Sequence, residues 1–446
     1  MADLRFSYSL DEIKQMSEDV LKVAKNLGAS AAEAELSLSI GQNVSVRLNE
    51  VENIEYNRDK GMSVTVYFGQ QKGHASSSDL SQQALKDTVA AACNIAKYTA
   101  KDEFCGLADA QLMAKHIPDL ALHHPWHISV DEAILLAQAC EAAALSVDAR
   151  ITNSEGASVS TGEGYFAYSN THGFTGGYPS SRHGLSCSVI AESADNMQRD
   201  YWYSTARAAS DLQTPADIGQ MAGVRAIRRL NSRKISTCQV PVLFEAPLAS
   251  GLISTLINAI SGGSLYRKSS FLLDSLGKQI ASPLLNIVED PHLKKGLASS
   301  PFDNEGVATQ ARQLVKDGVL QGYVLASYSA RKLGMQTTGN AGGNHNLIVQ
   351  SGSHDFAGML RQMGTGLLVT ELLGSGVNMV TGDYSRGAAG FWVENGVILH
   401  PVEEITIASN MADMLKMIVG IGTDVLIQSS KQVGSILIER MTVASD

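Results

Sequence analysis

The stretch "VLFEAPLASGLISTLINAISGG", residues 242–263, decides how the second half of the chain begins to fold. A short apolar run leads into a segment in which apolar residues recur every three or four positions from Leu248 to Ile260, the spacing of a buried helix. Pro247 fits only in a first helical turn, so Glu245 lies at the helix entrance, where exposed N–H groups favour a carboxylate. The residues predict a buried strand, then a buried helix, with one acid at the junction. Taken alone, Glu245 is also typical of an ordinary helix-end acid.

The composition limits the class of protein. The chain has 446 residues, of which 44% are hydrophobic and 18% charged, which indicates a globular protein of two or more domains. Its net charge of -10 argues against direct nucleic-acid binding, because no basic excess exists to displace counterions. No signal peptide is expected from "MADLRFSYSLDEIKQ", and no run of 18 apolar residues predicts a membrane span. Five scattered cysteines without a CxxC motif suit a reducing compartment, so the sequence predicts a cytoplasmic enzyme or enzyme subunit.

The fold class expected from the pattern is α+β with two domains. Residues 1–235 are predicted to form an N-terminal domain of helices and antiparallel strands, beginning with a helix capped by Ser9 and Glu12. Alternating residues over 32–79 and 151–206 predict strand groups, and helices are expected near 80–100, 130–145 and 214–233. Residues 236–446 are predicted to form a β-rich domain, barrel-like or sandwich-like, with a few helices. Its expected strands are "GYVLASYS", "HNLIVQSG", "GLLVTELLG", "GFWVENGVIL" and "GSILIERMTV".

Two groups of residues invite a chemical interpretation that the pattern does not favour. One segment with two prolines contains four histidines, which could bind a metal: His116, His123, His124 and His127. The prolines predict a loop, and histidines in such a loop are more often exposed to solvent than bound to a metal. Five further histidines are interpreted as loop residues: His172, His183, His345, His354 and His400. The glycine runs at 339–345 and 364–376 lack the spacing of a phosphate-binding loop, so tight turns are expected there.

The run "DYSRGAAGFWVENG", residues 383–396, is the candidate peptide-binding segment. Small residues followed by an aromatic pair can form a strand with an open edge, which would accept an extended peptide by strand addition. A hairpin with an internal ion pair among Asp383, Arg386 and Glu394 explains the same residues equally well. The candidate substrate-binding residues are Asp383, Tyr384, Ser385, Arg386 and Gly387.

Several long stretches together resemble one family. They are "LFEAPLASGLISTLINAISGGSLYRKSSFLLDSLGKQI", "GLASSPFDNEGVATQ", "SYSARKLGMQTTGNAGG", "MGTGLLVTELLGSGVN" and "TGDYSRGAAGFWVENGVILHPVEEITIASN". In this order they resemble the TldD/PmbA family, and specifically its PmbA (TldE) branch, historically called modulator of DNA gyrase. The resemblance covers essentially the whole chain and is densest over residues 240–410.

The resemblance implies a cytoplasmic zinc metallopeptidase made of two homologous subunits. TldD-type chains carry a His-Glu-x-x-x-His signature and a late cysteine, and these bind zinc. The signature falls here on Phe244, Glu245 and Ala249, so the carboxylate is kept and both imidazoles are absent. No cysteine follows Cys238. Because phenylalanine and alanine offer no donor atom, no catalytic residue and no metal are expected in this chain, and zinc is expected in the TldD-like partner.

The resulting hypothesis is a non-catalytic subunit that pairs with a TldD-like catalytic subunit to degrade unfolded peptides, such as a microcin leader or an antitoxin. A homodimer is expected to be possible in isolation. Two alternatives stay open. One is a metallopeptidase active by itself through another metal site, for example in the His116–His127 group. The other is a regulatory protein that binds DNA gyrase or an RNA-binding regulator.

Overall fold

The protein was analysed as a computed structural model that describes residues 6–194 and 196–445. The fold is α+β, as expected. Its first half consists of α1 (Leu10–Asn26), β1 (Ala31–Arg47), β2 (Glu50–Phe68), β3 (Gln71–Ser77), α2 (Gln82–Tyr98), η1 (Ala110–Leu112), α3 (Val130–Leu145), β4 (Ile151–Asn170), β5 (Thr175–Ser193), β6 (Asn196–Ala206), η2 (Ala209–Asp211) and α4 (Pro215–Arg228). Its second half consists of β7 (Cys238–Phe244), α5 (Ala246–Ala259), α6 (Gly262–Tyr266), β8 (Ile287–Asp290), β9 (Arg312–Lys316), β10 (Val319–Leu320), α7 (Ser327–Lys332), β11 (Asn346–Val349), α8 (Phe356–Met363), β12 (Gly366–Leu373), β13 (Asp383–Glu394), β14 (Val397–Asn410), α9 (Met411–Lys416), β15 (Ile418–Ile421), β16 (Lys431–Gln432) and β17 (Ile436–Ser445).

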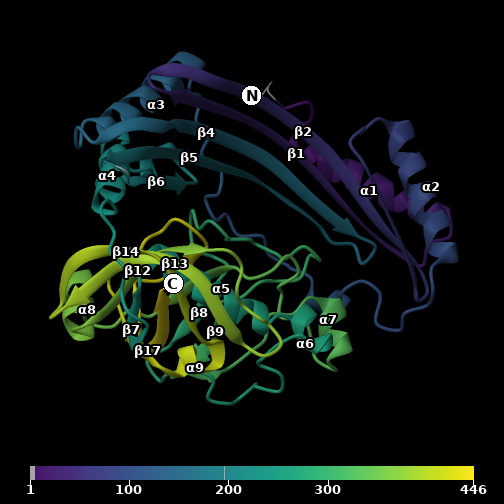
Figure 1. Ribbon diagram of the computed structural model, residues 1–446. Helices are drawn as coiled ribbons and strands as arrows, with labels where there is room; N and C mark the ends of the chain where they lie inside the picture. Colours follow the sequence, from purple (N-terminus) through teal and green to yellow (C-terminus); the bar gives the residue numbers. More distant parts are fainter. Residues whose placement is uncertain (1–5, 195, 446) are drawn as a thin grey trace.

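The N-terminal half is built on one antiparallel sheet of six strands in the order β3-β2-β1-β4-β5-β6. The expected strand groups and helices are all present, and α1 starts with the predicted capping box of Ser9 and Glu12. Long strands let this sheet twist and curve, and in Figure 1 it arches over the C-terminal half.

All four helices of this half cover one face of the sheet. On β1 the even-numbered residues Leu36 and Leu38 are buried with residues of α1 and α2, and Val44 and Val46 are buried with residues of α3 and α4. Since alternate residues of a strand point to opposite faces, these positions share a face. The odd-numbered residues of β1 belong to the other face, which is turned toward the C-terminal half (Figure 1).

The C-terminal half contains a closed barrel, which settles the choice between barrel and sandwich. Five strands follow one another in the order β14-β13-β12-β7-β17, and β17 pairs back with β14 to close the ring, while β15 adds to β17 outside it. Helix α5 lies against this barrel and contributes the buried residues Leu252, Ile253 and Leu256 to its core. The buried strand and helix expected at 242–263 are thus β7 and α5.

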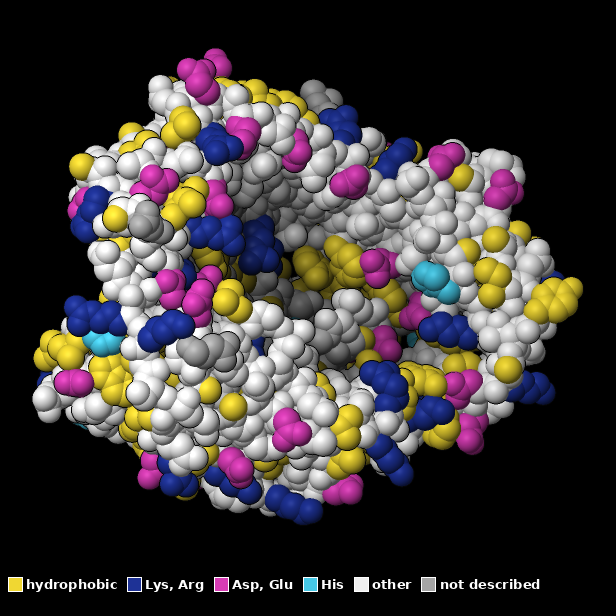
Figure 2. All heavy atoms as spheres, in the orientation of Figure 1, with side chains coloured by type: hydrophobic (Ala, Val, Ile, Leu, Met, Phe, Trp, Pro, Cys, Tyr) yellow, Lys and Arg dark blue, Asp and Glu magenta, His cyan; other side chains and the backbone are white. Residues whose placement is uncertain are grey.

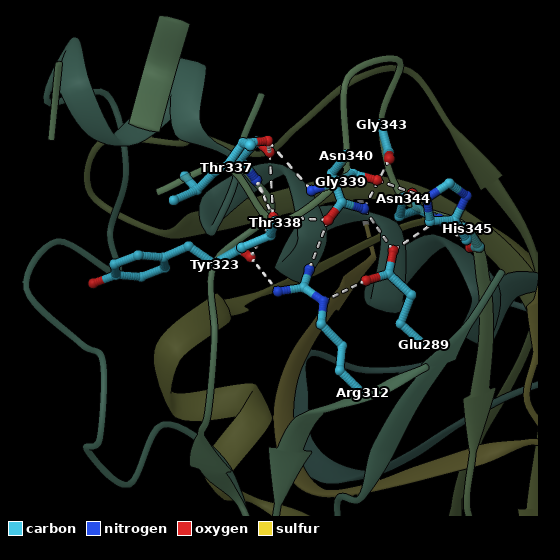
Figure 3. A network of polar contacts seen from close by, with 11 residues as sticks. Glu289, Arg312, Tyr323, Thr337, Thr338, Gly339, Asn340, Gly343, Asn344 and His345 are labelled. Carbon is cyan, nitrogen blue, oxygen red and sulfur yellow. Dashed lines mark hydrogen bonds and ion pairs between the residues drawn. The ribbon is translucent and has the colours of Figure 1, made fainter. Parts of the chain in front are cut away.

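A second sheet in this half has the order β10-β9-β8-β11-β16, and it carries a polar network centred on the buried Glu289 (Figure 3). Glu289 accepts hydrogen bonds from Arg312 Nε at 2.8 Å, from Asn340 Nδ2 at 2.8 Å and from the His345 N–H at 2.8 Å. The 339–345 glycine run therefore forms tight turns around this carboxylate, with positive φ at Gly339. Every polar group in such a network needs a partner, because an unpaired buried charge is costly.

Some local predictions were wrong. The segment 322–329 is not a strand: Val324 makes one isolated bridge and the chain then enters α7. His183 lies in β5 and His400 in β14 rather than in loops, because both alternate correctly with the neighbouring strand residues. His345 lies in a loop, as expected, but it is buried beside β11, and its Nε2 lies 2.9 Å from the Gly339 carbonyl. The loop expected for the histidine-rich segment, residues 115–129, is confirmed.

We propose that residues 1–235 and 236–446 are the two folding units, since β6 and α4 complete the first sheet before β7 opens the barrel. The two halves enclose a hollow between the curved sheet and the barrel, visible in the centre of Figure 2. They also share an aromatic cluster, in which Phe302 from the C-terminal half lies 5.6 Å from Tyr178 and 5.1 Å from Phe174, ring centre to ring centre. In the described part of the chain, no helix is long and apolar enough to cross a membrane.

Candidate functional site

The three residues at the signature positions do not face a common cavity. Phe244 ends β7 and Ala249 lies in the first turns of α5, and neither side chain is exposed. Both belong to the apolar core between α5 and the barrel. Glu245 lies between them as the residue before α5, and its side chain makes no capping hydrogen bond to that helix. The expectation of a helix-end acid is therefore correct in position, but the carboxylate is used differently.

The Glu245 carboxylate is held by two arginines of α4. Arg225 Nη1 lies 2.9 and 3.0 Å from its two oxygens, and Arg228 Nη2 lies 3.3 Å from one of them. Arg225 also donates from Nε to Asp200 of β6 at 3.1 Å. The side chains of Arg225 and Asp200 are 7% and 5% exposed, so this is a buried network in which Glu245 joins the barrel to the N-terminal sheet.

The arginines are packed on aromatic rings as well. The Arg225 guanidinium lies over Trp202 at 5.2 Å, and that of Arg228 lies over Phe391 at 4.9 Å from the ring centre. Burial lowers the pKa of the Arg228 guanidinium from its ordinary value, and the charge of Glu245 opposes this shift. The carboxylate and its arginines thus stabilise one another as charged groups.

A cavity of about 290 Å³ lies next to this network, between α4, β6 and the ends of α5 and β12. Its lining is Glu155, Ser188, Arg199, Asp200, Tyr201, Trp202, Tyr203, Arg225, Arg229, Pro247, Leu248, Thr370, Glu371, Leu372 and Gln428. These side chains can bind polar groups through carboxylates, guanidinium groups and hydroxyls. The lining includes no histidine or cysteine, whose nitrogen and sulfur atoms supply most of the ligands of catalytic zinc sites.

The residues present do not fit the zinc that the family resemblance implies. Phe244 and Ala249 supply no donor atom, and both oxygens of Glu245 are already bonded to arginine. Among residues 6–194 and 196–445, no group of three or more His, Cys, Asp or Glu side chains is placed to hold a metal ion.

The histidine-rich loop offers no substitute. His123 Nε2 lies 3.2 Å from Glu163, and His124 Nε2 lies 3.0 Å from the Ala121 carbonyl. His183, from β5, has its Nε2 2.8 Å from the His124 carbonyl, and burial lowers the pKa of its ring. These histidines hold the loop on the sheet as single contacts rather than converging on one point.

The open strand edge expected within residues 383–396 is wrong. β13 is an interior strand of the barrel, with β14 on one side along its whole length and β12 on the other from Gly387 onward. Beyond the end of β12, the loop that follows it forms hydrogen bonds with β13. The Ser385 N–H donates to the Gly376 carbonyl at 2.8 Å, and Arg386 Nη2 donates to the Gly374 carbonyl at 2.5 Å. No backbone edge remains for strand addition there.

The expected ion pair within this hairpin is not formed in the described residues either. Glu394 instead accepts from Trp392 Nε1 at 2.9 Å, and Asp383 accepts from the Thr381 hydroxyl. Tyr384 is buried, whereas Asp383 and Ser385 are exposed. Contact between these exposed side chains and a substrate remains a prediction.

The residues that organise the site were not found from the sequence. The sequence pattern indicates only that Arg225 and Arg228 are basic residues near the end of a helix and that Asp200 is a polar residue in a strand. The signal that could have revealed them is weak: Arg225 lies on the face of α4 that also carries Ala222 and Ala226, so its charge points into the core and requires a partner.

A larger cavity, of about 950 Å³, lies at the far end of the hollow, between β1–β3, the loop at 99–106 and the start of α7. Glu33 is its deepest acid: Tyr67 and Tyr168 donate to its two oxygens at 2.9 and 2.7 Å. Burial raises the pKa of the Glu33 carboxyl; the hydrogen bonds from the two tyrosines oppose this rise, and the nearby charge of Glu305 adds to it.

This raised pKa has a measurable consequence. In the pH range between the ordinary and the raised pKa, the folded state holds a proton that the unfolded state has released, so the free energy of unfolding falls as the pH rises. We expect Glu33→Gln to remove this dependence of the free energy of unfolding on pH. The free energy of unfolding of the wild type, relative to that of the variant, should therefore decrease from about pH 4 upward. Urea unfolding of both proteins at a series of pH values checks this, and parallel curves would contradict it.

The comparisons with known proteins agree with this architecture. Family models match residues 237–445 as the PmbA/TldA metallopeptidase C-terminal domain, 123–230 as the central domain and 32–96 as domain 1. The chain belongs to the PmbA/TldD metallopeptidase family. It is 51% identical to "Metalloprotease PmbA" of Escherichia coli O157:H7, over 97% of this chain and 96% of that protein.

Two further proteins are similar to this chain. The crystal structure of a putative modulator of DNA gyrase from Bacteroides thetaiotaomicron superposes with a TM-score of 0.93 at 30% identity, over 98% of this chain and 99% of the other. A "Metalloprotease TldD homolog" of Haemophilus influenzae is 26% identical over 52% of this chain and 53% of its own length. The chain is thus of the PmbA branch, and the family it belongs to is named for metalloprotease activity.

Proposed function

We propose that this PmbA-branch chain is the non-catalytic subunit of a TldD/TldE-type zinc metallopeptidase that degrades unfolded peptides in the cytoplasm. The observation that carries the proposal is the state of Glu245. A peptidase of this kind needs a metal to lower the pKa of a bound water and a free carboxylate to take its proton. Here the carboxylate is bonded to Arg225 and Arg228, and its neighbours Phe244 and Ala249 are buried and apolar.

The partner we propose is a TldD-like chain that brings its own zinc ligands. Such chains exist in this family, and one of them is similar in sequence to about half of this chain, which is consistent with a pseudo-twofold pair of homologous subunits. This chain would then supply walls of the peptide-binding hollow. We keep the exposed side chains of Asp383 and Ser385, together with Arg386, as candidate contacts with the substrate.

Reconstitution tests the proposal. The purified chain alone should not cleave an unfolded peptide and should contain no stoichiometric zinc by elemental analysis. Adding a TldD-like subunit should produce cleavage that a chelator abolishes. Chelator-sensitive turnover by the lone chain would support the alternative of an independent metal site, and recovery of DNA gyrase rather than a TldD-like chain in a pull-down would support the regulatory alternative.

A matched variant asks whether Glu245 takes part in the chemistry. In the reconstituted complex, Glu245→Gln should change kcat by less than about three-fold, whereas loss of a general base lowers rates by about 10²–10⁴-fold. The corresponding Glu→Gln change in the partner's signature serves as the control that does lose activity.

A further inference from the structure

The open strand edge that β13 lacks is present elsewhere, on β2. β3 pairs with β2 only from Met62 to Phe68, while β1 covers the other side of β2 along its length. Residues 50–61 therefore have no strand neighbour on their outer side in the described part of the chain. Figure 1 shows β2 running along the border of the curved sheet.

The side chains along this edge of β2 are unusually exposed to solvent. All residues from 50 to 60 are exposed, and they include Val51 at 44%, Ile54 at 42% and Tyr56 at 69%. Proteins usually cover such edges or interrupt them with proline or bulges, because free N–H and C=O groups attract other strands. One register shift interrupts the pairing with β1 near Asn53, but the stretch from 53 to 61 pairs regularly and contains no proline.

A slot of about 550 Å³ opens beside the same residues. Its floor is formed by the face of β1, β2 and β4 that lies between the two pairs of helices, where Gln42 pairs with Tyr56 and Ile40 with Arg58. Its roof is the loop at 126–129, which brings Trp126, His127 and Ile128 over the strands. The slot thus combines apolar and aromatic walls with the unpaired edge.

We propose that residues 53–61 of β2 bind an extended peptide as an added strand, with an apolar or aromatic side chain of that peptide at the mouth of the slot. In strand addition, main-chain hydrogen bonds supply affinity and pockets for alternate side chains supply preference. A side chain opposite Tyr56 lies within about 4.5–5.5 Å of it, Cβ to Cβ, on the face that opens into the slot.

The occupant we infer is an unfolded substrate peptide, and in this respect alone the inference rests on the proposed function. An unfolded chain exposes alternating apolar residues and free backbone groups, which are the two features that this edge and slot accept. Binding here would hold a substrate on the N-terminal sheet, away from the Glu245 network.

The test measures binding to the lone chain, without a partner and without hydrolysis, so its failure is distinct from failure of the proposed function. The probe is a labelled nine-residue peptide of alternating threonine and valine with a central tryptophan, followed by fluorescence anisotropy. Two further peptides carry N-methyl groups at all odd or at all even positions. Because only alternate N–H groups of a strand face its neighbour, one methylated peptide should lose at least ten-fold in affinity and the other should retain it.

Variants locate the binding site. Tyr56→Ala should weaken binding at least ten-fold and should reduce the preference for a central tryptophan over a central aspartate. Tyr98→Ala, which removes an exposed tyrosine from α2, is the matched control and should bind normally. Equal binding of both methylated peptides, equal affinities of the two variants, or sedimentation showing that a second copy of the chain already occupies this edge would each overturn the proposal.

Discussion

Replacing Arg225 by alanine should lower the free energy of unfolding by about 3–5 kcal/mol, because two buried carboxylates lose the cation they share and each keeps only a longer contact with another arginine. Among the described residues, Arg225 is the one cation that pairs with both Asp200 and Glu245. Arg229 lies 3.8 Å from Asp200, and Arg228 lies 3.3 Å from Glu245. Loss of Arg225 would therefore weaken the junction between the sheet and the barrel. Chemical unfolding followed by tryptophan fluorescence measures the change.

A surface ion pair of the same kind provides the control for that experiment. Arg199 lies 3.0 Å from Glu155, and its side chain is 68% exposed. Arg199→Ala should cost less than about 1 kcal/mol, because solvent screens an exposed pair. A similar loss from both variants would show that burial of the Arg225 network does not contribute to stability.

Rebuilding the histidine signature should destabilise the protein without making it a peptidase. In the double variant Phe244→His, Ala249→His, a polar ring replaces the fully buried Phe244 and a second must fit where Ala249 has no free space. We expect the free energy of unfolding to fall by about 3–5 kcal/mol, the range for truncating a buried aromatic side chain. Zinc content and peptide cleavage should remain near background, because the retained carboxylate is still bonded to Arg225 and Arg228.

The single variant Phe244→Leu separates the two effects. It keeps the position apolar and should lose less stability than Phe244→His, which adds the cost of burying a polar group. If the double variant bound zinc stoichiometrically and cleaved peptide in a chelator-sensitive manner, further ligands would have to come from elsewhere in this chain. That result would contradict the proposal of a non-catalytic subunit.

Much of the fold could be predicted from local sequence patterns. The capped start of α1, the bounds of α3 and the strand-to-helix junction at Glu245 each depend on residues a few positions apart. Periodicity and capping report the backbone of a single element, and they do so well where the pattern is long. The short segment at 322–329 was misjudged because a brief apolar run is compatible with a strand, a turn or a helix.

The site was less accessible to the same reasoning. The sequence showed that Phe244 and Ala249 cannot bind a metal, since this follows from residue type alone. It could not show that Glu245 is bound to Arg225, because the two residues belong to different halves of the fold. It also assigned an open edge to β13 rather than β2, since both strands carry alternating small and aromatic or polar residues and only pairing distinguishes them.

By itself, then, the sequence determined the family, the α+β class and the absence of ligand atoms at two signature positions, all of which depend on residue identity and local order. Three features were decided by the tertiary structure alone. They are the pairing of β17 with β14 that closes the barrel, the hydrogen bonds from two arginines to the Glu245 carboxylate, and the free edge of β2. Each of these depends on which backbone and charged groups meet across long separations in the chain. A buried charge or a strand edge acquires its role from the partner it finds, and that partner is fixed only when the whole chain has folded.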